Sequence, residues 1–168
     1  MEIQFQNEPI SQIPYPNIAY YYKKDFVTKG FTYLMKLVLL TKKYPELINE
    51  IQNYKDQVNA GPIPPLYIAC ANSCSSEVVK QLINCGADVN SHLQGTTALM
   101  MACSTNNLEA VKELIKNGAD INKIESQYSG NTALMYACEK SNVEIVKELL
   151  EAGAYICPMG EKNTHRYK

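Results

Sequence analysis

Cysteine and histidine are the residue types through which this chain could bind a metal or supply a nucleophile. Six cysteines and two histidines occur in its 168 residues. Zinc sites need such ligands at characteristic spacings, and the set Cys70, Cys74, Cys85 and His92 matches no familiar zinc finger. Neither His92 nor His165 recurs with a nucleophile or a paired acid, and no glycine-rich phosphate loop is present. The sequence therefore predicts that the protein is not an enzyme, with no catalytic residue, metal or cofactor. A small-ligand or metal site at Cys74, Cys85 and His92 stays open as an alternative.

Three of the cysteines share one position in a repeated pattern. Cys70, Cys103 and Cys138 each follow an alanine. We expect all three to be small apolar side chains inside the core, as free cysteines often are. Helices packed side by side lie about 10 Å apart, which is too far for a disulfide between neighbouring units. The sequence thus disfavours disulfides as well as zinc.

The segments that carry these cysteines recur along the chain. From Thr97 the sequence reads TALMMACSTNNLEAVKELIKNGADIN, and from Thr132 it reads TALMYACEKSNVEIVKELLEAGAYI. A third copy, PPLYIACANSCSSEVVKQLINCGADVN, begins at Pro64, so that corresponding leucines are 33 and then 35 residues apart. A repeat of this period indicates a stacked solenoid, because one unit cannot bury its own apolar face.

Each unit contains two predicted helices. In the first, Leu99, Ala102 and Cys103 fall at i, i+3 and i+4, on one face of a short helix. The small residues of this face allow a neighbouring helix to approach closely. A polar turn follows, after which Ser141 and Glu144 predict a capping box that starts the second helix.

The second helix is defined by an apolar stripe and a terminal glycine. Gly153 is expected to end it, because the residue after a helix often takes a left-handed conformation that costs glycine little. The stripe that we expect the helix to bury consists of Val143, Val146, Leu149 and Leu150.

The recurring pattern G-x-T-x-L-x-x-A…V-x-x-L-L-x-x-G-A-D-x-N resembles the ankyrin repeat, with three copies over residues 61–156. The family's usual Pro and His after the threonine are here Ala98 and Met100, and Ala133 and Met135. The resemblance implies an all-α fold, an ankyrin-repeat solenoid of stacked helix-turn-helix units joined by β-hairpin-like fingers. It divides this part of the chain into repeats at 61–92, 93–125 and 126–156.

The stretch GFTYLM, Gly30 to Met35, indicates a degenerate copy of the same unit. It matches GTTALM, Gly95 to Met100, at four of six positions. Either Val58-Asn59 or Ile48-Asn49 would then be the pair that ends this copy. We expect residues 23–60 to form a degenerate N-terminal capping repeat, since a terminal repeat meets a neighbour on one side only. Residues 1–22 are expected to be an extended N-terminal segment, and residues 157–168 a C-terminal tail.

Charge and hydropathy limit the classes of partner. The formal net charge is −1, and both signs are spread along the chain, so that we expect no nucleic acid partner. The longest apolar run, Phe31 to Leu40, is about half the length that a bilayer requires, so that we expect no membrane partner. The first residues, MEIQFQNEPISQIPYP, lack the basic start and apolar run of a secretory signal. We therefore expect a cytoplasmic protein, and a monomer.

Because we expect no catalytic site, metal, nucleic acid or membrane partner, we expect the function to depend on a surface that binds a protein. In ankyrin-like proteins, partners usually bind the concave side, which is made by the finger tips and the first helices. The resemblance therefore implies a non-catalytic protein–protein interaction module with a protein partner of unknown identity. Carried over by position, the partner-binding candidates are Ala71, Asn72, Leu93, Gln94, Thr96, Ser104, Thr105, Tyr128, Ser129, Asn131, Glu139 and Lys140.

Tyr128 is the most distinctive of these candidates. Its finger, KIESQYSG, is two residues longer than the preceding one, and aromatic residues often carry interface energy. The alternative is a tolerated loop change in which Tyr128 packs on the neighbouring finger.

Two wider hypotheses concern the role of such a module. Repeats with TALM in place of the usual motif, and this Asn-, Lys- and Ile-rich composition, resemble those of large DNA viruses and intracellular microbes. A host-directed viral or microbial adaptor in the host cytoplasm would follow from that resemblance. The alternative is a regulatory or scaffolding subunit of an enzyme complex such as a ubiquitin ligase.

Overall fold

A computed structural model describes residues 33–43, 45–125 and 130–156 of the chain. The predictions for residues 1–22 and 157–168, and for Tyr128 and Ser129, lie outside these described residues. The elements in chain order are α2 (Tyr33–Leu40), η2 (Pro45–Gln57), α3 (Pro65–Ala71), α4 (Ser76–Asn84), β1 (His92–Leu93), β2 (Thr96–Thr97), α5 (Ala98–Ser104), α6 (Leu108–Lys116), α7 (Ala133–Glu139) and α8 (Val143–Glu151).

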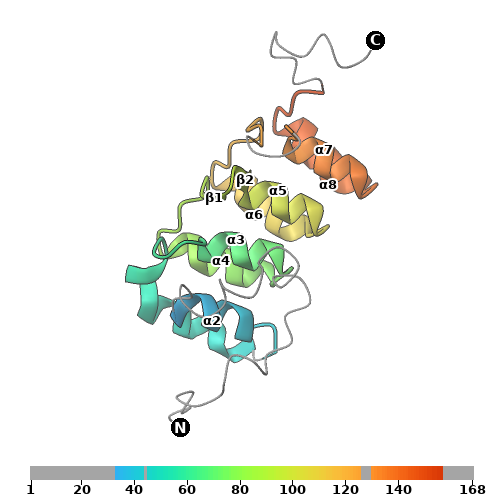
Figure 1. The fold of residues 1–168 in the computed structure, drawn as a ribbon. Coiled ribbons are helices and arrows are strands. Elements are labelled where there is room, and N and C mark those ends of the chain that lie inside the picture. Colours follow the sequence, from blue (N-terminus) through green and yellow to red (C-terminus); the bar gives the residue numbers. More distant parts are fainter. Residues whose placement is uncertain (1–32, 44, 126–129, 157–168) are drawn as a thin grey trace, which may run out of the picture.

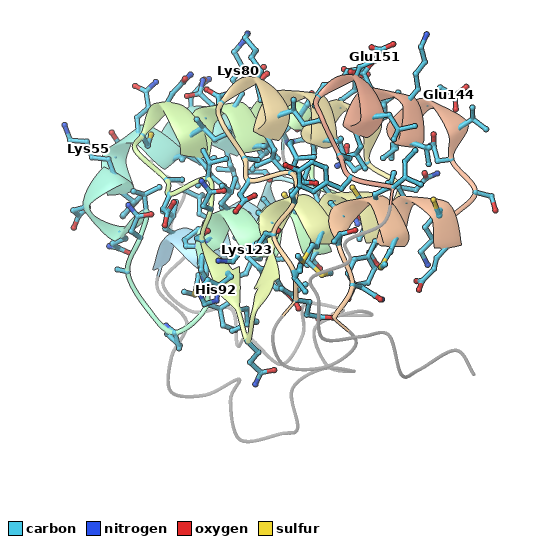
Figure 2. All side chains as sticks on the ribbon, turned by 90° about the horizontal axis from the view of Figure 1, so that it is seen from above. Lys55, Lys80, His92, Lys123, Glu144 and Glu151 are labelled. Atoms are coloured by element: carbon cyan, nitrogen blue, oxygen red, sulfur yellow. The ribbon has the colours of Figure 1, made fainter. Side chains whose placement is uncertain are left out.

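The helices pair and stack in chain order from α2 to α8, as Figure 1 shows. The inner helices α2, α3, α5 and α7 form one row, in which α5 packs against both α3 and α7. The outer helices η2, α4, α6 and α8 form a second row, in which α6 packs against both α4 and α8. Figure 2 shows these two rows, with His92 on a hairpin that extends beyond the helices. One continuous apolar core runs between the rows, from Leu34 in α2 to Leu149 in α8. The all-helical repeat solenoid implied by the sequence is confirmed.

The inner helices are short and begin at the threonines of the repeat. The hydroxyl of Thr97 accepts a hydrogen bond from the backbone N–H of Met100 at 3.3 Å, and Thr132 accepts one from Met135 at 3.4 Å. These bonds satisfy amides that a helix start leaves without a partner. Pro64, which occupies the same position before α3, makes no such bond. The inner helices α3, α5 and α7 each bury an alanine completely, which lets the neighbouring helices come close: Ala69, Ala102 and Ala137.

Helix α8 begins one residue later than the predicted capping box. Asn142, and not Ser141, is the N-cap of α8, because its side chain accepts the N–H of Ile145 at 3.0 Å. Ser141 has φ +55°, a left-handed conformation that belongs to the turn and not to an N-cap. The same pattern occurs before α6, where Asn107 is the cap. The prediction of a Ser141–Glu144 capping box was wrong.

The apolar stripe of α8 also differs from the prediction. Ile145 and Leu149 are fully buried against α7, and Val146 is half-buried. Val143 and Leu150, however, are 73% and 40% exposed. The two residues are seven positions apart on one side of the helix, and α8 has no described helix pair after it. The stripe prediction was therefore correct for Leu149 and wrong for Val143 and Leu150.

Glycine ends the outer helices α4, α6 and α8, as the sequence predicted for Gly153 in the last of them. Gly86, Gly118 and Gly153 have φ of +92°, +84° and +92°. The N–H of each glycine, and that of the following alanine, bonds back to a carbonyl in the last turn of the helix.

Asparagine side chains join each unit to the next. Asn59, Asn90 and Asn122 occupy equivalent positions, and each uses its amide nitrogen as donor and its amide oxygen as acceptor across 27 to 33 residues of sequence. Asn59 thus makes the bonds of the repeat-ending residue, whereas Asn49 lies inside η2. The carbonyl partners are Gly86, Gly118 and Gly153, and the N–H partners are Asp88, Asp120 and Tyr155, at 2.7 to 3.3 Å.

Candidate protein-binding surface

The finger between α4 and α5 is a short β-hairpin. Leu93 in β1 pairs with Thr96 in β2, and the register is antiparallel. Gln94 and Gly95 form the two-residue turn between them, both with positive φ (+50° and +85°). Paired positive φ values match the twist of the two strands. Gln94 is therefore exposed at a tip whose geometry is well defined.

The accessible residues of α5 fall on one side of the helix. In α5 and at its end, Met101, Ser104 and Thr105 are partly exposed at i, i+3 and i+4, while the rest of the helix up to Cys103 is buried. One repeat later, Tyr136 is partly exposed and Glu139 and Lys140 are fully so. We call the accessible members of this row the inner surface: Ala71, Met101, Ser104, Thr105, Tyr136, Glu139 and Lys140.

The structure places most of the predicted candidates on or beside the inner surface. Gln94, Glu139 and Lys140 are exposed, and Ala71, Leu93, Ser104, Thr105 and Asn131 are partly exposed. Asn72 and Thr96 are buried, and both make internal hydrogen bonds, to the carbonyl of Ile68 and to the carboxylate of Glu125. These two residues offer a partner the least surface among the predicted candidates that the structure describes. Met101 and Tyr136, which the sequence reasoning missed, lie in the accessible row.

A buried acid that the sequence reasoning also missed lies at the base of the finger between α6 and α7. Glu125 is only 4% exposed, and it occupies the position that Leu93 holds in the preceding repeat. Its carboxylate accepts hydrogen bonds from the Thr96 hydroxyl at 2.6 Å and from the Tyr136 hydroxyl at 3.1 Å. Its N–H donates to the carbonyl of Asn131 across the finger at 2.9 Å. Glu125 therefore joins two fingers and an inner helix. A polar residue at a position that is apolar in the preceding copy was the available signal.

Charge separates the two rows of helices. The inner helices α3 (PLYIACA) and α5 (ALMMACS) contain no charged residue. The outer helices α4, α6 and α8 each carry Lys and Glu, with exposed ion pairs at 3.6 to 4.0 Å. Lys112 pairs with Glu109 in its own helix and with Glu148 in α8. Such exposed pairs contribute little to stability. The outer helices therefore present a charged, solvent-exposed surface. The inner helices α3 and α5 are therefore a neutral stretch of the inner row, whereas α7 ends in the charged Glu139.

The cysteines behave as packing residues in the middle of the stack. Cys70, Cys74 and Cys103 are buried, and the thiol of Cys74 donates to the carbonyl of Val38 at 3.7 Å. Burial raises the pKa of Cys103 to about 12 and that of Cys74 to about 11, and it also raises the pKa of Cys70. Thiols with raised pKa values are poor nucleophiles and poor metal ligands at neutral pH.

Cys138 does not follow this rule. It is exposed, so the prediction that all three repeated cysteines lie inside the stack was wrong for the last one. Cys70 and Cys103 are covered by the next inner helix, and no described helix follows α7 in that row.

The structure does not assemble the alternative metal site. Cys74 is buried beside α2, whereas His92 is exposed on β1. In residues 33–43, 45–125 and 130–156, no group of three or more His, Cys, Asp or Glu side chains is placed to hold a metal ion. Across the same described residues, no helix has both the length and the apolar character needed to cross a bilayer.

Comparison with known proteins agrees with this geometry. A family model described as ankyrin repeats (three copies) matches residues 32–125 and 66–159. Together the two matched ranges cover the chain from the residue before α2 to beyond α8, so they include every repeat described above. Comparison with curated proteins finds no match. The stacked helix pairs, the threonine caps, the glycine ends and this match together show that the chain belongs to the ankyrin-repeat family.

Proposed function

We propose that this protein is a non-catalytic protein-binding module whose partner contacts the inner surface and the finger between β1 and β2. Ankyrin repeats are generally protein–protein interaction modules, and the family is typically non-catalytic. The proposal includes a cytoplasmic location of this protein, in keeping with the expectation from the sequence. A host-directed viral or microbial role belongs to the same proposal as a more specific form of it.

The observation that carries this proposal is the difference in charge between the two rows. Nothing in the packing requires α3 and α5 to be free of charge on their accessible side, since Met101, Ser104 and Thr105 all reach solvent. A surface that is neutral and partly apolar costs little to desolvate, whereas the Lys and Glu side chains of the outer row would have to lose water. The neutral row is therefore the better docking face.

The neighbouring side chains give that face a recognisable character. Met101 is flexible and polarisable, and Tyr136 combines an apolar ring with a hydroxyl that Glu125 already fixes. Glu139 and Lys140 add one charge of each sign at the far end of the row. We therefore expect the partner to present a mainly uncharged, apolar segment to α3 and α5.

A pair of matched variants tests the proposal. Ser104→Arg places a cation on the inner surface, and Glu109→Arg places one on the outer helix of the same repeat. Tagged wild type and both variants would be used to capture proteins from extracts of cells that express the chain, after circular dichroism has shown equal helicity. We expect a protein retained by wild type and by Glu109→Arg to be lost with Ser104→Arg.

The other outcomes are informative as well. Retention by both variants would place binding outside the inner surface and would contradict the proposal. Loss with Glu109→Arg alone would assign binding to the outer row. An enzyme retained at fixed stoichiometry would identify the regulatory or scaffolding role as the form that this binding takes.

A further inference from the structure

An asparagine followed by a glycine lies at the end of α6. Asn117 is the C-cap of this helix, and Gly118 is the glycine that ends it. The sequence contains no other Asn-Gly pair. At the corresponding ends of α4 and α8, the residue before the terminal glycine is Cys85 or Ala152. Of these three helix ends, only that of α6 therefore places a side-chain amide next to the backbone nitrogen of a glycine.

These two groups permit a reaction that needs no enzyme. The backbone nitrogen of Gly118 can attack the side-chain carbon Cγ of Asn117, which closes a five-membered succinimide ring. The bond from Cγ to Nδ2 breaks, and Nδ2 leaves as ammonia together with the proton from the glycine nitrogen. Water then opens the ring at either carbonyl and gives an aspartate or an isoaspartate residue. Glycine favours the attack because it has no Cβ beside its nitrogen.

The surroundings of the pair leave room for this ring. Asn117 and Gly118 are both exposed, so water reaches them. A side chain placed on Gly118 would meet no atom within 4 Å beyond its chain neighbours. Two hydrogen bonds hold the groups in place, from the N–H of Gly118 to the carbonyl of Ile115 at 3.0 Å and from Nδ2 of Asn117 to the carbonyl of Glu113 at 2.7 Å. Both bonds lie at the end of a helix, where local opening costs less than in the middle.

A side chain of the preceding repeat restrains the same turn. Nδ2 of Asn90 donates to the carbonyl of Gly118 at 3.3 Å, and Oδ1 of Asn90 accepts the N–H of Asp120 at 2.7 Å. These bonds hold the backbone on both sides of Ala119, and they oppose the rotation that brings the glycine nitrogen towards Asn117. The rate of the reaction therefore depends on how tightly the two repeats are joined.

The products of the reaction weaken that junction. A carboxylate at position 117 lies at the C-terminal end of α6, where the helix dipole disfavours negative charge. It also lies beside Glu113, whose carboxylate Oε1 accepts a hydrogen bond from Nδ2 of Asn117 at 3.0 Å before the reaction. An isoaspartate residue adds a methylene to the backbone as well, which displaces the carbonyl of Gly118 that Asn90 binds. Both products therefore loosen the contact between the two repeats.

We propose that Asn117 is a site of spontaneous modification, at which deamidation through a succinimide loosens the junction between the α3–α4 and α5–α6 repeats. The bond that joins the two repeats slows the reaction, and the reaction then disrupts the bond. Modification thus converts the protein into a less stable form at a rate that the fold controls. This inference does not depend on the proposed protein binding.

Prolonged incubation of the full chain at mildly alkaline pH tests the site. Mass spectrometry would follow the peptide that contains residue 117, after chromatography has separated its aspartate and isoaspartate forms. We expect both forms to accumulate in the folded chain, and to accumulate faster in the chain unfolded by urea. Asn117→Gln should abolish the product at this position, because its longer side chain would have to close a six-membered ring, which forms far more slowly.

A matched pair of variants separates the local restraint from overall stability. Asn90→Ala removes the bond to the carbonyl of Gly118. It should raise the rate in the folded chain about fivefold, as the loss of one ordinary hydrogen bond does. Asn122→Ala removes the equivalent bonds at the next junction, to Gly153 and Tyr155, and it should leave the rate unchanged.

The modified chain provides a second readout. It should unfold at a lower urea concentration than the fresh chain, and its Asp120 amide should exchange hydrogen faster. Absence of product from the folded chain, over a period in which the unfolded chain converts fully, would overturn the proposal. Equal acceleration by Asn90→Ala and Asn122→Ala would also overturn it, because global opening would then control the rate. A modified chain with unchanged unfolding and unchanged exchange would overturn the inferred effect on the junction.

Discussion

The repeat formed by α5 and α6 and the repeat formed by α7 and α8 have nearly the same sequence but different surroundings. Both begin TALM, and both place Thr, Leu, Ala and Cys in the same order. The first is packed between two neighbours, whereas the second has a described neighbour only on the α5–α6 side. Met100, Cys103 and Val111 are consequently buried, while their counterparts in the last repeat reach solvent. In a solenoid, the contribution of a residue to the free energy of unfolding depends on the neighbouring repeats as well as on the residue type.

The methionines of the two TALM motifs should show the largest difference. Met100 is 1% exposed, whereas Met135 is partly exposed. We expect Met100→Ala to cost about 3 kcal/mol of unfolding free energy and Met135→Ala about 1 kcal/mol, because only the first leaves a cavity. Urea unfolding followed by circular dichroism measures both. Equal losses would mean that the last repeat is packed as tightly as the middle one.

Alkaline pH should reveal the buried thiol of Cys103 in the middle of the stack. Burial raises the folded-state pKa of Cys103 from 9.0 to about 12, so the unfolded chain loses this proton first. The stabilisation is complete below pH 9 and declines as pH rises towards 12, by about 1.4 kcal/mol at pH 10 for this thiol. Unfolding free energies at pH 8 and pH 10 should therefore differ less in Cys103→Ala than in wild type. An equal difference in wild type and in Cys103→Ala would contradict the assignment.

The asparagine side chains that join successive repeats, Asn59, Asn90 and Asn122, form an asparagine ladder. Its members should show a smaller and more local contrast. Asn90→Ala removes two bonds in the middle of the stack, and Asn122→Ala removes two at its end. Because these side chains lie near solvent, we expect losses of about 1 kcal/mol for Asn90 and less for Asn122. Hydrogen exchange locates the effect, since the amide of Asp120 should exchange faster in the first variant and that of Tyr155 in the second. Unchanged exchange at these amides would show that the ladder bonds contribute little.

The threonine caps should show the smallest contrast, because capping is local. Thr97 and Thr132 are both buried, and each accepts one hydrogen bond from the N–H three residues later. Thr→Val at either position should cost about 1 kcal/mol, with little difference between the two repeats. Thermal unfolding of the two variants checks this equality. A much larger loss at Thr97 would indicate that cap strength, like side-chain burial, depends on the neighbouring repeats.

Local features of the repeat could be predicted well from the sequence, and features that depend on neighbours could not. The helix end at Gly153 and the burial of Leu99, Ala102 and Cys103 follow from conformational preference and spacing, and both are confirmed. The capping box at Ser141 failed because two polar residues adjoin and only backbone geometry selects Asn142 as the cap. The boundaries of the individual repeats, and the capping role of residues 23–60, stay predictions.

The candidate surface shows the same division. The resemblance to ankyrin repeats gave Ser104, Glu139 and Lys140 as candidates by their position in the repeat, and all three are accessible. This succeeded because helix periodicity fixes which side of the helix these positions occupy. Glu125 was missed because its role depends on Thr96, 29 residues earlier, and on Tyr136, 11 residues later. Contacts at such distances are not visible in a local pattern.

The sequence by itself determined the repeat, its two-helix unit and the residues that end each helix, because these depend on period, side-chain size and backbone preference within a few residues. The tertiary structure alone decided which copies of a residue are buried. Burial requires a neighbour, and the exposed Cys138 and Val143 show that the same position becomes surface wherever the stack places no helix beside it.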